Sequence, residues 1–243
     1  MTTGELLISN RTANPAAKTS LRSAALIAGL GLLLMVVAAP FAELFVFPKL
    51  VVPGNALETT QNIIANKTLF ASAIFGYLIT FLCDLVVAWA LYVLLKPVHE
   101  NLSLLTAWFR LVYTMIALDA LLNLVTVLRI LNTSAILIGS QLDQFSAQVM
   151  LSIQSFRSHW YFGLIFFGIH LGLLGYLAIR SKYIPSILGI LLIIAGSGYL
   201  LTNLKPLLFP NINLDFAEYT FYGELVFMLW LLIKGPKIQE QNQ

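Results

Sequence analysis

The stretch LITFLCDLVVAWALYVLL, residues 78–95, decides the fold of this chain. An α-helix rises about 1.5 Å per residue and the hydrocarbon core of a bilayer is about 30 Å thick, so a crossing needs about 20 mostly apolar residues. This run, extended back to residue 70, is long enough to cross. It contains Asp84, and an ionisable group at membrane depth is costly unless it faces the interior of a helix bundle. The stretch therefore predicts a membrane span with a buried polar contact.

The whole chain has the composition of a membrane protein. Of its 243 residues, 59% are hydrophobic and 10% are charged, a balance that a soluble globular domain of this size does not show. The first apolar run extends to about Phe47, beyond the usual core of a signal peptide, so it is interpreted as a retained span. The six predicted spans are residues 23–46, 70–95, 103–130, 160–180, 185–203 and 219–234. We therefore expect an all-α integral membrane fold, a six-helix transmembrane bundle over residues 22–235, with tails at residues 1–21 and 236–243.

The distribution of Lys and Arg predicts the orientation. With a cytoplasmic N-terminus, the inner segments hold eight basic residues and the outer segments five, and basic residues favour the cytoplasmic side. The inner residues are Arg11, Lys18, Arg22, Lys96, Arg180, Lys182, Lys234 and Lys237, and the outer ones are Lys49, Lys67, Arg129, Arg157 and Lys205. Both termini are therefore expected in the cytoplasm, and the expected location is the cell membrane, that is, the inner or plasma membrane.

Two segments between spans are predicted to form short outer helices, in loops 1 and 3. In the first, Asn55 follows Pro53 and Gly54 and precedes Glu58 by three residues, which is a capping-box pattern. In the second, apolar residues share one helical face, a pattern typical of a helix that lies on the membrane or caps the bundle. That face consists of Leu142, Phe145, Val149, Ile153 and Phe156. An amphipathic connector is favoured here over a ligand-operated lid.

Ionisable residues within the spans are the natural functional candidates. They are Glu43, Asp84, Arg110, Asp119, His170 and Glu224. Spans two and three are antiparallel and joined by a short loop, so Arg110 can reach Asp84 across a depth difference of about 7 Å. We expect these two to form a structural ion pair, which fixes register more reliably than it adds stability. Catalysis or ion transport at Asp84 is the alternative.

The other candidates divide between ligand binding and packing. Glu43 and Glu224 are expected near the outer ends of spans one and six, where they line an outward-facing vestibule if those helices are neighbours; solvated rim carboxylates are the alternative. Asp119 and Asn123 fall on one stripe of span three. The ligand-binding candidates are thus Glu43, Asp119, Asn123 and Glu224. His170 is expected to be buried and hydrogen-bonded.

No recognisable motif points to an enzyme class. The patterns HExxH, CxxC, GxSxG, GxGxxG and the P-loop are absent from the sequence. No metal and no cofactor are therefore expected, and no catalytic residue can be named. The basic residues are scattered and form no stripe, so nucleic acid is not an expected partner. The expected partners are the lipid bilayer and a small-molecule ligand, and the oligomeric state is left open.

Several motifs, in order, resemble those of a family of bacterial membrane proteins. They are FAELFVFPKLVVPGNALETTQNIIANKTLF, ALYVLLKPV, FRLVY, YLAIRSKYIPSILGILLIIAGSGYL and GELVFMLWLLIKG. Over residues 22–235 the chain resembles the family described as domain of unknown function 4386. The resemblance implies a multi-pass bundle and assigns no residue a role. Positions shared with the family pattern are Glu43, Pro53, Gly54, Asp84, Arg110, Tyr183, Pro185 and Glu224.

Three functions follow as alternatives. The first is a non-enzymatic membrane protein that binds or moves a small cationic or lipophilic ligand, which a vestibule lined by Glu43 and Glu224 would favour. The second is an intramembrane enzyme acting on a lipid or small substrate, with Asp84, Asp119 and His170 converging as acid and base. The third is an accessory subunit that packs on another membrane protein through Gly-rich faces. The absence of a nucleophile or metal set favours the first over the second.

Overall fold

The structure, a computed structural model, describes residues 19–133, 140–208 and 211–238, and every regular element within them is helical. The all-α prediction is therefore confirmed. The elements are α1 (Leu21–Pro40), the π-helical turn η1 (Phe41–Val46), α2 (Phe47–Leu50), α3 (Ala56–Ala65), α4 (Lys67–Leu95), α5 (Glu100–Thr133), α6 (Ser140–Arg180), α7 (Ser186–Leu208), the 3₁₀ turn η2 (Asp215–Phe221), α8 (Tyr222–Ile233) and the 3₁₀ turn η3 (Gly235–Lys237).

Five helical stretches are long and apolar enough to cross a membrane. They are Leu21–Leu50, Lys67–Leu95, Glu100–Asn132, Leu142–Arg180 and Ser186–Leu208, with mean hydropathies of 2.0 to 2.4. A sixth apolar stretch, Tyr219–Ile233, is shorter. Stretches of this length and composition indicate a membrane protein.

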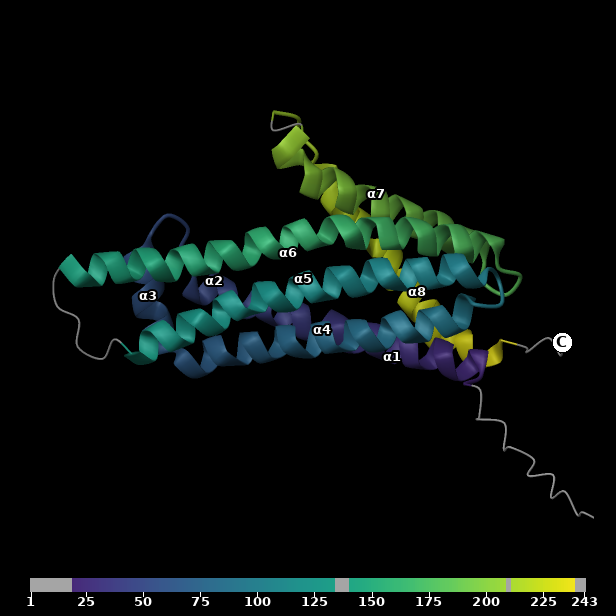
Figure 1. The fold of residues 1–243 in the computed structure, drawn as a ribbon, viewed down its shortest axis with the longest axis horizontal. Helices are drawn as coiled ribbons and strands as arrows, with labels where there is room; N and C mark the ends of the chain where they lie inside the picture. Colours follow the sequence, from purple (N-terminus) through teal and green to yellow (C-terminus); the bar gives the residue numbers. More distant parts are fainter. Residues whose placement is uncertain (1–18, 134–139, 209–210, 239–243) are drawn as a thin grey trace, which may run out of the picture.

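The long helices pack side by side along one axis (Figure 1). Helices α4, α5 and α6 follow that axis, α1 packs against α4 and α8, and α7 packs against α6 but diverges from the bundle toward its own C-terminal end. The guanidinium Nε of Arg22 donates a hydrogen bond of 2.7 Å to the carbonyl of Ile238. The first and last described helices therefore meet at the same end of the bundle.

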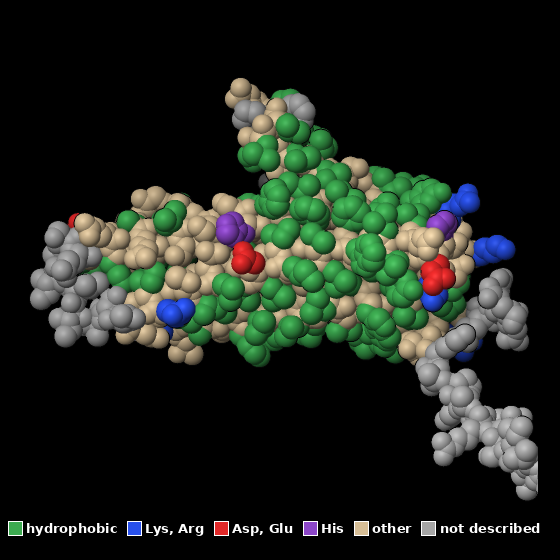
Figure 2. All heavy atoms as spheres, viewed as in Figure 1, with side chains coloured by type: hydrophobic (Ala, Val, Ile, Leu, Met, Phe, Trp, Pro, Cys, Tyr) green, Lys and Arg blue, Asp and Glu red, His purple; other side chains and the backbone are tan. Residues whose placement is uncertain are grey.

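Charged pairs mark two levels on the long axis. Lys96 and Glu100 form an ion pair of 2.9 Å at one level, and His159 lies 3.4 Å from Asp119 at the other. From Glu100 to Asp119 the helix α5 rises about 29 Å, close to the thickness of one hydrocarbon core. Apolar side chains cover most of the surface between charged groups in Figure 2. The two levels thus bracket an apolar band of the thickness that a bilayer requires.

Helix α3 begins directly after Asn55, where the capping pattern predicts a helix start. The Asn55 Oδ1 accepts the Glu58 backbone N–H at 3.0 Å, and its Nδ2 donates to the Glu58 carboxylate at 2.8 Å. Gly54 has a φ of 77°, in the left-handed region that favours glycine. These contacts fix the turn that leads from α2 into α3.

Asn55→Ala should therefore lower the free energy of unfolding by about 1 kcal/mol, because one N-terminal N–H of α3 loses its side-chain acceptor. The measurement is urea unfolding of the detergent-solubilised protein. Gln61→Ala is the matched control, since Gln61 is an exposed residue in the interior of the same helix and caps neither end of it. Equal losses in the two variants would contradict the assignment of the cap to Asn55.

The predicted second outer helix is not a separate element. Residues 142–156 form the first half of α6, which runs without interruption from Ser140 to Arg180. No Gly or Pro breaks the backbone before Gly163, and the apolar face packs inward: Val149, Ile153 and Phe156 are buried. That face covers α3 and α5, so it forms interior contacts.

Candidate functional site

A buried ionic cluster joins three helices of the bundle. A terminal nitrogen of Arg110, on α5, lies 2.6 Å from the Asp84 carboxylate on α4, and the two side chains are 1% and 0% exposed. The other terminal nitrogen of Arg110 donates to His170 Nε2, on α6, at 3.2 Å. The guanidinium also lies 5.2 Å from the ring of Phe167, a cation–π contact. Arg110 is thus the centre that ties α4 to α5 and α6.

The hydrogen bonds of His170 assign its tautomer. Its Nδ1 lies 2.8 Å from the backbone carbonyl of Thr106, and a carbonyl oxygen only accepts, so Nδ1 carries the proton. Nε2 is then free to accept from Arg110. Both ring nitrogens are used within the chain, and the described residues contain no group of His, Cys, Asp or Glu side chains that could hold a metal ion. His170 therefore acts here as a support for Arg110.

A pocket of about 670 Å³ lies among η1, the middle of α6, the C-terminal half of α7 and η2. Its wall combines aromatic rings with one carboxylate and one carboxamide. The residues that define its chemistry are Glu43, Trp160, Tyr161, Tyr199, Asn203 and Phe221. We call this the acidic aromatic pocket.

The π-helical turn places Glu43 at the acidic aromatic pocket. Pro40 cannot donate a backbone hydrogen bond, and the next six residues wind as η1; π-turns of this kind often occur at functional sites. The Glu43 carboxylate accepts a hydrogen bond from the Tyr77 hydroxyl and lies 3.8 Å from Arg157. At 28% exposed, it remains accessible from the pocket.

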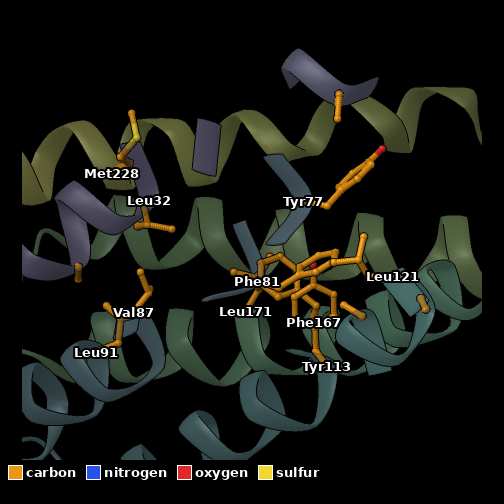
Figure 3. Packing of buried hydrophobic residues seen from close by; sticks show 14 of the residues in the cluster. Leu32, Tyr77, Phe81, Val87, Leu91, Tyr113, Leu121, Phe167, Leu171 and Met228 are labelled. Carbon is orange, nitrogen blue, oxygen red and sulfur yellow. The ribbon is translucent and has the colours of Figure 1, made fainter. Parts of the chain in front are cut away.

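The inner wall of the acidic aromatic pocket lies close to the ionic cluster. Trp160 Nε1 donates to the Tyr113 hydroxyl at 3.2 Å. The rings of Tyr113 and Tyr199 lie 4.9 Å and 5.2 Å from that of Phe167, and Phe167 contacts Arg110. Figure 3 shows Tyr113 and Phe167 packed together in this layer. One layer of rings thus separates the pocket from the buried charges.

Glu224 lies behind the pocket wall. Its carboxylate faces the Tyr199 hydroxyl and is close enough for its charge to interact with Arg110 and Asp84. Glu224 is therefore nearer the interior than the outer-rim position expected from the sequence. The first turn of α8 packs closely on α7 next to this residue: a Cβ on Gly223 would lie 2.6 Å from the Leu191 carbonyl.

The vestibule expected between spans one and six stays a prediction, because the acidic aromatic pocket is lined mainly by α6, α7 and η2 and Glu224 is not part of its lining. Helices α1 and α8 are in contact. Glu43 lines the acidic aromatic pocket, and Glu224 reaches its wall through Tyr199. These two ligand-binding candidates are brought to one region.

The other two ligand-binding candidates lie outside that region. Asp119 is 68% exposed and faces His159 on the surface. Asn123 donates its side-chain N–H to the Ala120 carbonyl of its own helix at 3.0 Å. Asp119 lies nine residues beyond Arg110 on α5, about 13 Å along the axis, so Asp84, Asp119 and His170 do not form one acid–base group.

The small residues of α6 and α7 pack against each other. An ideal Cβ on Gly175 would lie 2.5 Å from the Gly189 carbonyl, and one on Gly196 would lie 2.6 Å from the Gly168 carbonyl. Close backbone approach of this kind is typical of helix contacts in membranes. The Gly-rich faces are thus occupied within the chain.

Sequence reasoning missed most of the pocket wall. Trp160 and Tyr161 were interpretable only as interfacial aromatic residues of a membrane helix. Tyr199 and Asn203 are four residues apart and so share a helical face, a polar stripe in span five that the search for ionisable residues does not detect. No pattern in the sequence around Arg157 predicts that its side chain lies beside Glu43.

Comparison with known proteins agrees with the sequence resemblance. The family model described as Domain of unknown function (DUF4386) matches residues 27–235. A protein from Archaeoglobus fulgidus, described as an uncharacterized protein, is 37% identical over 169 residues, which cover 69% of this chain and 86% of the relative. No solved structure matches. The matched region contains both the ionic cluster and the acidic aromatic pocket.

Proposed function

Because this chain belongs to the family described as domain of unknown function DUF4386, whose description names no activity, we propose a function from the geometry of its own site. The chain is a multi-pass protein of the cell membrane that binds a small organic cation with an apolar body in the acidic aromatic pocket. The observation that carries this proposal is the Glu43 carboxylate set among the rings of Trp160, Tyr161 and Tyr199.

The chemistry of the wall favours a cation over other ligands. Aromatic faces attract a positive charge within about 6 Å, an attraction worth about 0.5–2 kcal/mol per ring depending on desolvation. A carboxylate beside those rings adds an opposite charge, and the rings themselves accommodate apolar groups. The volume of about 670 Å³ lies within the range of small-molecule sites. A lipophilic organic cation satisfies all three features.

Arg157 leaves Glu43 available for such a ligand. Its distance of 3.8 Å from the carboxylate is longer than the roughly 2.8 Å of a charge-assisted hydrogen bond. The Arg157 guanidinium lies 5.5 Å from the centroid of the Phe47 ring, a cation–π contact that holds it beside the carboxylate without a short hydrogen bond to it. Tyr77 then remains the hydrogen-bond donor that orients the carboxylate.

The proposed topology has six crossings, with Tyr219–Ile233 as the last. Support comes from the contact between Arg22 and Ile238, which brings the two ends of the described chain together. Basic residues at that end, including Lys96, Arg180 and Lys234, favour a cytoplasmic position. The acidic aromatic pocket, at the level of Trp160, then faces the outside.

The alternatives have less support. An intramembrane enzyme needs free acid and base groups, whereas Asp84 and His170 both bind Arg110. An accessory subunit that docks through glycine faces needs those faces exposed, whereas α6 and α7 cover them. The acidic aromatic pocket is lined by η1, α6, α7 and η2 near one level of the bundle, so we favour binding at this pocket over passage across the bundle.

A titration with tetraphenylphosphonium tests this proposal. The wild-type protein in detergent is expected to bind this cation, and Glu43→Gln should weaken binding about tenfold, or about 1.4 kcal/mol, because the carboxylate charge is lost while its shape is kept. Isothermal titration calorimetry gives the dissociation constants. Asp119→Asn is the control, since it removes a carboxylate on the surface, and it should bind as the wild type does. Equal binding by wild type and Glu43→Gln would contradict the proposal.

A further inference from the structure

A second pocket, of about 560 Å³, lies at the end of the molecule where the described chain begins and ends. It is formed by the α6–α7 connection, the last turns of α8 and η3. Its lining residues are Tyr183, Pro185, Trp230, Lys234, Lys237 and Ile238. We call this the basic pocket.

The basic pocket has two positive charges with no carboxylate partner in the described part of the chain. Neither Lys234 nor Lys237 forms an ion pair with any carboxylate among the residues that the structure describes. Lys96, at the same end of the bundle, is by contrast paired with Glu100 at 2.9 Å. Two unpaired ammonium groups in one pocket attract an anion.

The backbone around these lysines is held in place. Arg22 donates to the Ile238 carbonyl at 2.7 Å. Gly235 packs so closely on α1 that a Cβ would lie 2.7 Å from that of Ala25. The turn that carries Lys237 is therefore fixed to α1, and the pocket is part of the folded structure.

The opposite wall is fixed and uncharged. The Tyr183 hydroxyl donates to the Leu94 carbonyl, which anchors the α6–α7 connection to the end of α4. Burial raises the pKa of Tyr183 to about 12, so this residue brings no negative charge to the pocket at neutral pH. An anion in the pocket thus meets two cations and no opposing charge from Tyr183.

Apolar side chains of α8 extend from the basic pocket along the lipid-facing surface. Trp230 lies one turn before Lys234 on α8, and tryptophan favours the boundary between headgroups and hydrocarbon. Val226, Leu229 and Ile233 on the same helix are 45%, 49% and 61% exposed. An apolar chain can lie along these residues while its charged end occupies the pocket.

We propose that the basic pocket binds the phosphate headgroup of an anionic phospholipid, with Lys234 and Lys237 as its charge partners and Trp230 at the start of its acyl chains. Basic pockets between membrane helices on the cytoplasmic side bind anionic headgroups in this way. The inference is independent of the ligand at the acidic aromatic pocket, because the two pockets share no lining residue.

The test uses the full chain in detergent and a short-chain lipid, dioctanoyl phosphatidylglycerol, with dioctanoyl phosphatidylcholine for comparison. Microscale thermophoresis should show at least tenfold tighter binding of the anionic lipid by the wild type. Lys234→Gln/Lys237→Gln should lose this preference. Lys96→Gln/Lys182→Gln carries the same net charge and removes two lysines outside the pocket, so it should keep the preference.

Three results would overturn the proposal. The first is equal binding of the two lipids by the wild type. The second is an equal loss in both double variants, which would indicate general surface charge. The third is competition by inorganic phosphate as strong as that by the lipid, which would indicate a free-phosphate site. Without lipid, the unfolding midpoint of Lys234→Gln/Lys237→Gln should be no lower than that of Lys96→Gln/Lys182→Gln, which also breaks the exposed Lys96–Glu100 pair, so that a loss of binding is not a loss of folding.

Discussion

Asp84→Asn should lower the free energy of unfolding by about 3–5 kcal/mol, and Arg110→Gln should do the same. Each change removes one charge of a pair that is 2.6 Å apart and almost fully buried. The partner is then left buried without its counter-charge, and the described residues offer no hydrogen-bond acceptor for Arg110 Nε and no donor for the second oxygen of Asp84. Thermal unfolding in detergent, followed by circular dichroism, measures the loss.

The double variant Asp84→Leu/Arg110→Met separates the loss of the pair from the cost of an unpaired charge. Replacing both partners by apolar residues leaves no buried charge, so it should recover most of the stability that either single variant loses. Asp119→Asn is the surface control and should change stability by less than about 0.5 kcal/mol. If both single variants unfolded at the same temperature as the wild type, the structural role of the pair would be contradicted.

Gly175→Ala should destabilise the protein, whereas Gly172→Ala should not. A Cβ on Gly175 would lie 2.5 Å from the carbonyl oxygen of Gly189, which is backbone and cannot move aside as a side chain can. Overpacking of this kind costs about 1–3 kcal/mol, and Gly175→Leu should cost more. Gly172 has no atom within 4 Å of an added Cβ, so alanine there should be neutral or gain up to about 1 kcal/mol of helix propensity.

The same unfolding experiment measures the stability of both glycine variants. The decisive result is which of the two variants is less stable. A Gly172→Ala variant as unstable as Gly175→Ala would mean that α6 and α7 do not meet through Gly175 and Gly189. That contact also sets the direction of α7, which carries Tyr199 to the pocket. Gly175→Ala should therefore weaken tetraphenylphosphonium binding even where the protein still folds.

The features that the sequence predicts best depend on local properties. Apolar windows of about 20 residues identify the helices because the lipid solvent selects them by composition. The cap at Asn55 depends on four consecutive residues. The expected pairing of Asp84 with Arg110 needed only helix rise and a short connection between antiparallel neighbours, and the structure places the two side chains 2.6 Å apart.

The features that the sequence does not predict depend on contacts between distant segments. Polar residues such as Asp143 and Gln148 lower the hydropathy before residue 160, yet α6 continues through them because its opposite face packs on α3 and α5. Glu224 lies near the interior because the first turn of α8 packs on α7 at Gly223. The acidic aromatic pocket exists because α7 diverges from the bundle (Figure 1), a direction set by tertiary packing.

Cysteine labelling in whole cells tests most directly whether the acidic aromatic pocket opens to the outside and holds a cation. Cys83 is the single cysteine of the chain, so Cys83→Ser/Thr202→Cys places one thiol at the pocket wall. A membrane-impermeant maleimide should label this thiol in intact cells, and tetraphenylphosphonium should slow the labelling. Labelling only after the cells are permeabilised, or at a rate that the cation leaves unchanged, would contradict the account.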